Sequence, residues 1–401
     1  MFAAIDRRWL LGGWVLVAAC GGAPPSHAPS QAVGTSIRVL PPPLGAGGAP
    51  PETAAPVAPP EPVATVGSLP YVLTPVPVTP SSPPLPIVLA IHGTAANDVW
   101  LVGSASRADD LSTSHLFHSD GRTVQLIQRD VCATSENYFP PTYTQLRAFR
   151  DRVELEGTTP GANQRFLASA TRRSNGAWSC GPSGTPSGWE VERFWSGGEA
   201  FGVWFTSDTI GWLDASGGSL GIDFFHGSGL PQAVAILPGG RHAWLVSDGR
   251  SERASSSLYE WSGVRWRARK DVLPAGVMPA DIFALSATAS GAYWGLTSTR
   301  LLRYDGARFL ALPLPVGFSL GALLATDADG VWVFAPHRVW RFYDGAWQTA
   351  PLLVDQVDAQ WLAPNGELWL AGSTFTADPE PKLESVVVAR LVPQRAPKGG
   401  G

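Results

Sequence analysis

A tryptophan that returns along the chain, each time in the same kind of apolar segment, limits the possible folds more than any other feature. One such segment reads Val99-Trp100-Leu101-Val102-Gly103. The positions in this column are Trp100, Glu154, Trp204, Trp244, Trp294, Trp332 and Trp369, at spacings of 37 to 54 residues. Recurrence at a period of about 20–50 residues is typical of repeat architectures, whose units bury apolar surface against their neighbours.

A turn dipeptide between two apolar stretches follows most of these segments. The dipeptides are Asp120-Gly121, Asn175-Gly176, Ser262-Gly263, Asp305-Gly306 and Asp344-Gly345. Such pairs predict hairpins, because glycine accepts the positive φ of tight turns. The third segment offers no clear turn. Each unit is therefore expected to hold four short strands, the pattern of a β-propeller blade, and no helical periodicity interrupts it.

Seven columns predict an all-β propeller of seven four-stranded blades over residues 68–393. The last unit lacks an outer strand, and we expect residues 71–78 to supply it, since Pro75 and Pro77 suit an edge strand. A six-bladed ring and two separate β domains are the alternatives.

The motif Asp-Val-Trp-x-Val-Gly followed by Tyr-Asp-Gly-x-x-Trp resembles the propeller repeats of secreted lipoproteins in myxobacteria and their relatives. Residues 98–103 carry the first half, and Tyr304-Asp305-Gly306 with Phe309 carries the second. The resemblance spans about residues 88–391, and Glu154 and the third unit depart from it. It implies a fold and a location, and it implies no catalytic residues.

The first residues resemble a bacterial lipoprotein signal. Arg7 and Arg8 precede a short apolar run that ends in Val17-Ala18-Ala19-Cys20. The run is too short to span a bilayer, which needs about 20 residues. The resemblance implies that residues 1–19 are a signal peptide and that Cys20 carries the lipid. An ordinary signal peptide or an uncleaved anchor are the alternatives.

The segment after the cysteine predicts a tether. Residues 20–67 are mostly Pro, Ala, Gly and Ser, a composition that cannot bury a core. In the sorting rule for enteric lipoproteins, Asp directly after the cysteine favours retention in the inner membrane. Gly21 stands there instead, so the outer membrane is favoured, on its periplasmic side or at the cell surface. Residues 394–401 are expected to be a flexible tail. The net charge of −4 argues against nucleic acid as a partner.

Two further cysteines, Cys132 and Cys180, predict a disulfide in an exported protein. Each is expected to follow the outer strand of its blade, in adjacent blades and on one face. Two unpaired thiols are the alternative.

Insertions point to one face as the binding side. They cover residues 104–114, 158–164, 248–257 and 373–384, and all fall on the side of the cysteine loops. The candidate contact residues are Arg107, Asp109, Trp189, Trp195 and Arg250. Burial is the alternative for the two tryptophans.

No motif for catalysis, for a metal or for a cofactor stands out. His115 and His118 are three apart on an expected strand, and so on opposite faces. The leading hypothesis is a monomeric, lipid-anchored, non-enzymatic module of the cell envelope that binds a protein or a glycan. An exported glycosidase or lyase with a site in the central channel, and a purely structural lipoprotein, are its rivals.

Overall fold

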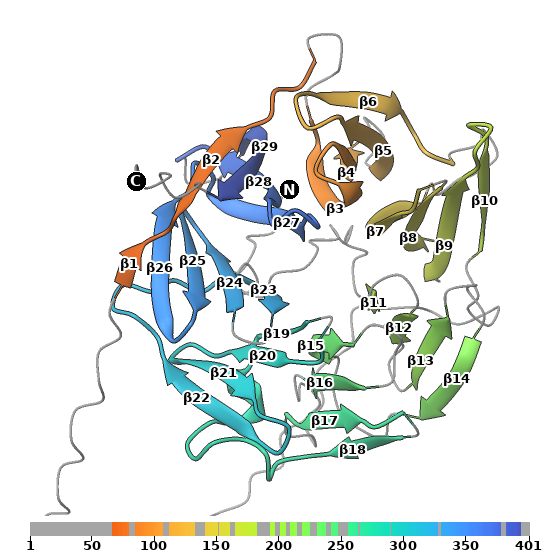
Figure 1. Cartoon of the computed structure of the whole chain (residues 1–401). Helices are drawn as coiled ribbons and strands as arrows, with labels where there is room; N and C mark the ends of the chain where they lie inside the picture. The colour runs from red at the N-terminus through yellow and green to blue at the C-terminus, as the bar shows by residue number, and fades with distance from the viewer. Residues whose placement is uncertain are drawn as a thin grey trace, which may run out of the picture. The chain divides into compact units, whose positions relative to one another are not determined.

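The described part of the computed structural model is built from seven β-sheets set around a common centre (Figure 1). It covers residues 66–79, 85–106, 112–132, 141–150, 152–160, 165–182, 193–196, 201–205, 209–214, 219–224, 231–237, 242–247, 256–263, 265–288, 290–327, 330–377 and 382–393. We number the sheets one to seven in chain order.

The first three sheets each hold four consecutive strands. Sheet one holds β3 (Ile87–Ala95), β4 (Asp98–Ser106), β5 (Ser112–Ser119) and β6 (Val124–Gln128). Sheet two holds β7 (Thr142–Ala148), β8 (Val153–Pro160), β9 (Arg165–Arg172) and β10 (Trp178–Pro182). Sheet three holds β11 (Arg193–Ser196), β12 (Phe201–Phe205), β13 (Thr209–Asp214) and β14 (Ser219–Phe224). The strands of the third unit between which the sequence offered no clear turn are β13 and β14, which pair antiparallel.

Sheets four and five repeat this order. Sheet four holds β15 (Pro231–Ile236), β16 (Ala243–Ser247), β17 (Leu258–Trp261) and β18 (Trp266–Ala268). Sheet five holds β19 (Ala284–Ala287), β20 (Tyr293–Leu296), β21 (Arg300–Tyr304) and β22 (Phe309–Pro313). A 3-10 turn, η2 (Pro279–Asp281), lies between them. Among the described residues, no helix has the length and apolar character needed to cross a bilayer.

The last two sheets recruit strands from the beginning of the described chain. Sheet six holds β23 (Ala322–Asp327), β24 (Gly330–Ala335), β25 (Arg338–Tyr343), β26 (Ala346–Pro351) and β1 (Val66–Ser68). Sheet seven holds β27 (Gln356–Leu362), β28 (Leu368–Phe375), β29 (Leu383–Pro393) and β2 (Tyr71–Pro75). In Figure 1 the first strand of each sheet lies nearest the centre.

The strand β2 completes sheet seven, as the sequence predicted. It pairs antiparallel with β29, from Tyr71 opposite Pro393 to Pro75 opposite Ala389. The strand β1 was not predicted, because the sequence places residues 66 and 67 in the tether. It pairs in parallel with β26. Backbone pairing at an edge needs no apolar pattern in the added strand, so the sequence carries no signal for it.

Each column residue lies on the second strand of its sheet, and the described tryptophans of the column pack against the following sheet. Trp244 contacts Tyr293 and Phe309 of sheet five, with ring centroids 6.5 and 5.3 Å away. Trp294 meets Phe342 of sheet six at 5.9 Å. Burial of such large rings contributes strongly to the packing between neighbouring sheets.

The same packing joins the last sheet to the first. Trp332 of sheet six meets Tyr71 of sheet seven at 5.0 Å. Trp369 of sheet seven shares an apolar cluster with Val88 and Val99 of sheet one. Trp369 is fully buried, like Trp244 and Trp294. The prediction that the column tryptophans serve packing is confirmed for those whose side chains are described.

In three of the insertions that the sequence interpreted as loops, the flanking strands continue into the insertion. The hairpin of β4 and β5 keeps its register from Ser104 opposite Ser114 to Ser106 opposite Ser112. The hairpins of β8 with β9 and of β28 with β29 lengthen in the same way. Ser and Thr look like loop residues in a sequence, yet their backbones pair without difficulty where the ladder continues.

The glycine that ends the repeated motif permits a close approach of two backbones. A Cβ atom on Gly372 would lie 2.5 Å from the carbonyl oxygen of Gln356, and one on Gly157 would lie 2.1 Å from that of Thr142. In both sheets the register of the first strand shifts at this point. The motif therefore needs a residue without a side chain beside the bulge.

We predict that Gly372→Ala lowers the free energy of unfolding by about 2 kcal/mol, because the backbone of β27 must move to admit the methyl group. Urea denaturation measures the change. Gly67→Ala is the matched control, since the nearest atom to its added Cβ is 3.9 Å away. Equal stability of the two variants would contradict this role of the bulge.

Candidate functional site

Two hollows lie on the side of the sheets where the first strand turns into the second and the third turns into the fourth. We call this the turn side. The volumes of the hollows are about 470 and 540 Å³, and both are lined by Pro364. Their other lining residues come from the turns and strand ends of sheets seven, one and two. We call the two together the turn-side hollow.

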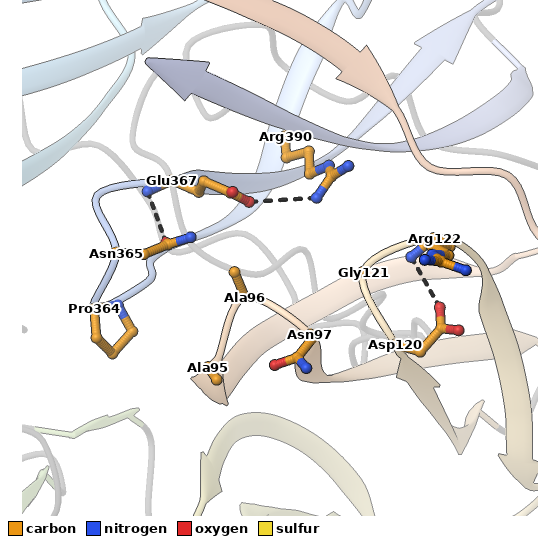
Figure 2. A pocket seen from close by; sticks show the side chains of 10 residues that line it. All are labelled: Ala95, Ala96, Asn97, Asp120, Gly121, Arg122, Pro364, Asn365, Glu367 and Arg390. Carbon is orange, nitrogen blue, oxygen red and sulfur yellow. Dashed lines mark hydrogen bonds and ion pairs between the residues drawn. The ribbon is translucent and has the colours of Figure 1, made fainter. Parts of the chain in front are cut away.

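The smaller hollow lies between sheets seven and one (Figure 2). Glu367 and Arg390 stand on one side of it, and Asp120 and Arg122 on the other, with the turn at Asn97 between them. Arg390 Nη1 lies 3.4 Å from Glu367 Oε2. The acidic group on this side of the hollow is thus neutralised in place.

The carboxylate of Asp120 is held by the backbone of its own turn. It accepts hydrogen bonds from the N–H groups of Thr123 and Arg122, at 2.9 and 2.8 Å. These bonds lower the pKa of Asp120. The side chain of Arg122 is exposed beside this turn. It has no hydrogen-bond or ion-pair partner among the described residues.

The larger hollow is lined by Trp361, Phe149, Arg150 and His92. The rings of His92 and Trp361 lie 5.7 Å apart. The backbone N–H of Ala148 donates to His92 Nδ1 at 3.2 Å, which leaves the proton of the neutral imidazole on Nε2. Burial, aided by the charge of Arg147, lowers the pKa of His92 to about 4.

We predict that His92 makes the protein less stable as the pH falls. Its pKa is 6.5 when unperturbed and about 4 in the fold, so the unfolded chain binds the proton first. The stabilisation is complete above pH 6.5 and declines towards pH 4, by up to about 3 kcal/mol.

The measurement is urea denaturation of the native protein and of His92→Gln across this pH range. Burial raises the pKa of Asp358 to about 6, and this group gives the opposite slope between pH 3.8 and 6. Asp358 is present in both proteins, so its effect cancels in their difference. A difference in stability that does not vary with pH would contradict the prediction.

A polar pair beside the column residue recurs on the turn side of three sheets. The first member of each pair lies two residues before the tryptophan. The second member lies on the third strand, directly opposite the tryptophan. The pairs are Asp98 with His118, His242 with Glu260, and Glu367 with Arg390. The sequence analysis missed this pattern, although the fixed offset from each tryptophan could have revealed it.

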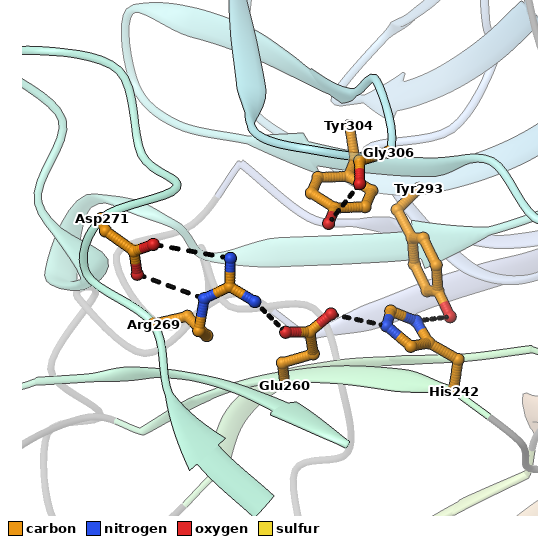
Figure 3. A network of polar contacts seen from close by, with 7 residues as sticks. All are labelled: His242, Glu260, Arg269, Asp271, Tyr293, Tyr304 and Gly306. Carbon is orange, nitrogen blue, oxygen red and sulfur yellow. Dashed lines mark hydrogen bonds and ion pairs between the residues drawn. The ribbon is translucent and has the colours of Figure 1, made fainter. Parts of the chain in front are cut away.

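The pair in sheet four extends into a network that reaches sheet five (Figure 3). His242 Nε2 lies 2.8 Å from Glu260 Oε1, and His242 Nδ1 lies 2.7 Å from the hydroxyl of Tyr293. Arg269 contacts Glu260 and, at 3.1 Å, Asp271. Tyr293 is buried, and burial together with the charge of Glu260 raises its pKa. The network therefore links two sheets.

The structure joins Cys132 to Cys180, with Cα atoms 5.8 Å apart. Cys132 follows β6, as predicted. Cys180 lies within β10 rather than after it, so that part of the prediction was wrong. The strand continues through the cysteine because residues 178–182 pair with β9.

Most of the remaining predicted site residues lie outside the described residues, namely Cys20, Arg107, Asp109, Trp189 and Arg250. Trp195 lies on β11.

The two histidines of β5 lie in different surroundings. His118 contacts Asp98 at 2.9 Å, and His115 lies 3.7 Å from Asp130. The described residues contain no group of three or more potential metal ligands.

Comparisons with known proteins give the fold. No family model matches the chain, and no curated protein matches it. The solved structure described as YCF48 bound to D1 peptide aligns with 83% of this chain and 100% of its own, at 13% identity and a TM-score of 0.54. Raptor from Chaetomium thermophilum aligns with 82% of this chain and 29% of its own, at 8% identity and a TM-score of 0.53. The chain therefore has a propeller-like, all-β fold.

Proposed function

We propose that this protein is a lipid-anchored, non-enzymatic interaction module of a bacterial cell envelope. Its seven sheets are the blades of a closed propeller, which works as a monomer. Cys20 carries the lipid, and residues 20–65 tether the propeller to the membrane. The propeller binds another component of the envelope at the turn-side hollow, on the opposite side of the sheets from the insertions that the sequence favoured as the binding side.

The observation that carries the proposal is the lining of the turn-side hollow. Aromatic rings, unpaired guanidinium groups and a neutral imidazole N–H converge there from three sheets. Such a mixture of apolar surface and a few placed polar groups is typical of a recognition site. The similarity in fold to YCF48, whose solved structure holds a peptide, is in keeping with this function.

The titratable groups of the hollow suit recognition better than proton transfer. A general acid or base works best with a pKa near the working pH. The backbone hydrogen bonds to Asp120 lower its pKa, and Glu367 is paired with Arg390. The pKa of His92, at about 4, keeps its imidazole neutral at physiological pH. An enzymatic function is therefore the less favoured alternative.

We predict that Cys20→Ala abolishes the lipid anchor, because the sulfur atom is the site of acylation in the lipoprotein signal. Metabolic labelling with radioactive palmitate should mark the native protein and leave the variant unlabelled. Fractionation should move the variant out of the membrane pellet. Equal labelling of both proteins would refute the anchor.

We predict that Asn97→Trp prevents capture of the partner, because the indole would fill the smaller hollow from its central turn. The measurement is cross-linking in intact cells, followed by recovery of the tagged full-length protein. Asn175→Trp is the control, since this asparagine lies in the β9–β10 turn and lines neither hollow. Recovery of the same cross-linked species from all three proteins would count against binding at the hollow.

A further inference from the structure

We propose that the turn-side hollow binds an acidic, extended stretch of polypeptide that carries an apolar side chain. The inference rests on the proposed function and names the ligand of the same site. Three features of the hollow support it: the charge of its lining, the aromatic surface with its imidazole donor, and the position of its two open parts across sheets seven, one and two.

The charged side chains that line the hollow leave a positive excess at Arg150. Glu367 is paired with Arg390, and the ionised carboxylate of Asp120 lies beside Arg122, whose charge helps to lower the pKa of Asp120. Arg122 and Arg150 are exposed, and neither guanidinium has a hydrogen-bond or ion-pair partner within the described residues. A guanidinium binds a carboxylate through two parallel hydrogen bonds, so these arginines favour Asp and Glu side chains.

The apolar surface of the hollow comes from sheet seven, through Trp361, and from sheet two, through Phe149 beside Arg150. Trp361 and Phe149 are both partly exposed in the larger hollow. The Nε2–H group of His92 is a donor beside Trp361, because Nδ1 is occupied by the Ala148 N–H. A neutral donor next to an aromatic ring suits a peptide carbonyl flanked by an apolar side chain.

The shape of the hollow favours a chain over a compact molecule. Its two parts share Pro364, their walls come from turns and strand ends of sheets seven, one and two, and each part is open to solvent. Arg122 lies in sheet one and Arg150 follows the first strand of sheet two. A ligand that meets both must cross from one sheet to the next, as an extended segment does.

The close approach of sheets one and seven holds the floor of the hollow in place. A Cβ atom on Gly93 would lie 2.8 Å from the ring of Trp361 and 2.4 Å from the carbonyl oxygen of Asp98. The indole is therefore fixed against the backbone of β3. A surface that is already ordered loses little conformational freedom when a ligand binds.

The experiment measures fluorescence anisotropy of a short labelled peptide in which Asp and Glu alternate with Leu, added to the purified full-length protein in detergent. The comparison ligands are the same peptide with Asn and Gln, and polygalacturonate, an anionic glycan. The variant is Arg122→Gln with Arg150→Gln. Arg173→Gln is the matched control, because Arg173 is an exposed arginine in the β9–β10 turn and lines neither hollow.

We expect the acidic peptide to bind the native protein and the Arg173→Gln control equally, and the double variant about tenfold or more weakly, as the loss of two charge-assisted contacts implies. Binding should weaken as salt is added. Equal binding of the amide peptide, or an unchanged affinity in the double variant, would overturn the proposal. Binding of polygalacturonate in place of the peptide would assign the hollow to a glycan and overturn it too.

The two proposals can fail separately. If Asn97→Trp still prevents capture in cells while no acidic peptide binds, the ligand class is wrong and the hollow remains the binding site. If the acidic peptide binds but Asn97→Trp changes neither this affinity nor the capture, the peptide binds elsewhere, and both proposals fail.

Discussion

The packing of one large side chain per sheet against the next sheet is the constraint on which the fold depends. A four-stranded sheet with one apolar face cannot bury that face alone, and each described column tryptophan covers the face of its neighbour. The contact of Trp369 with sheet one joins the last sheet to the first. The strand β2, which comes from the opposite end of the chain, joins sheet seven at the same place.

The candidate site exists because the last sheet packs against the first. Its walls are supplied by residues 92–97, 120–122, 149–150 and 361–367 together with Arg390, which are far apart in the chain. They meet because sheet seven packs on sheet one, and because β3 and β7 lie side by side. The recurrent polar pairs lie along the same side, where column residues reach the ends of their strands.

The sequence predicted the parts of the fold that repeat. The column tryptophans, the Asp-Gly turns and the closing strand at Tyr71 all carry local signals that the structure confirms. It missed β1, which pairs in parallel at an edge without an apolar pattern, and it interpreted strand extensions such as Ser104–Ser106 as loops. The hollow could not be predicted, because its turns meet only where sheets seven, one and two pack together. The shifted pKa of His92 depends on burial that only the packed sheets create.

The most direct test of the account is hydrogen–deuterium exchange of the native protein and of Trp369→Ala, followed peptide by peptide. If the indole joins the last sheet to the first, the backbone amides of β27 to β29 and of β3 to β5 should all exchange faster in the variant. Those of sheets four and five should keep their native protection. Faster exchange confined to β28 and its hairpin partners, with sheet one unchanged, would contradict the account.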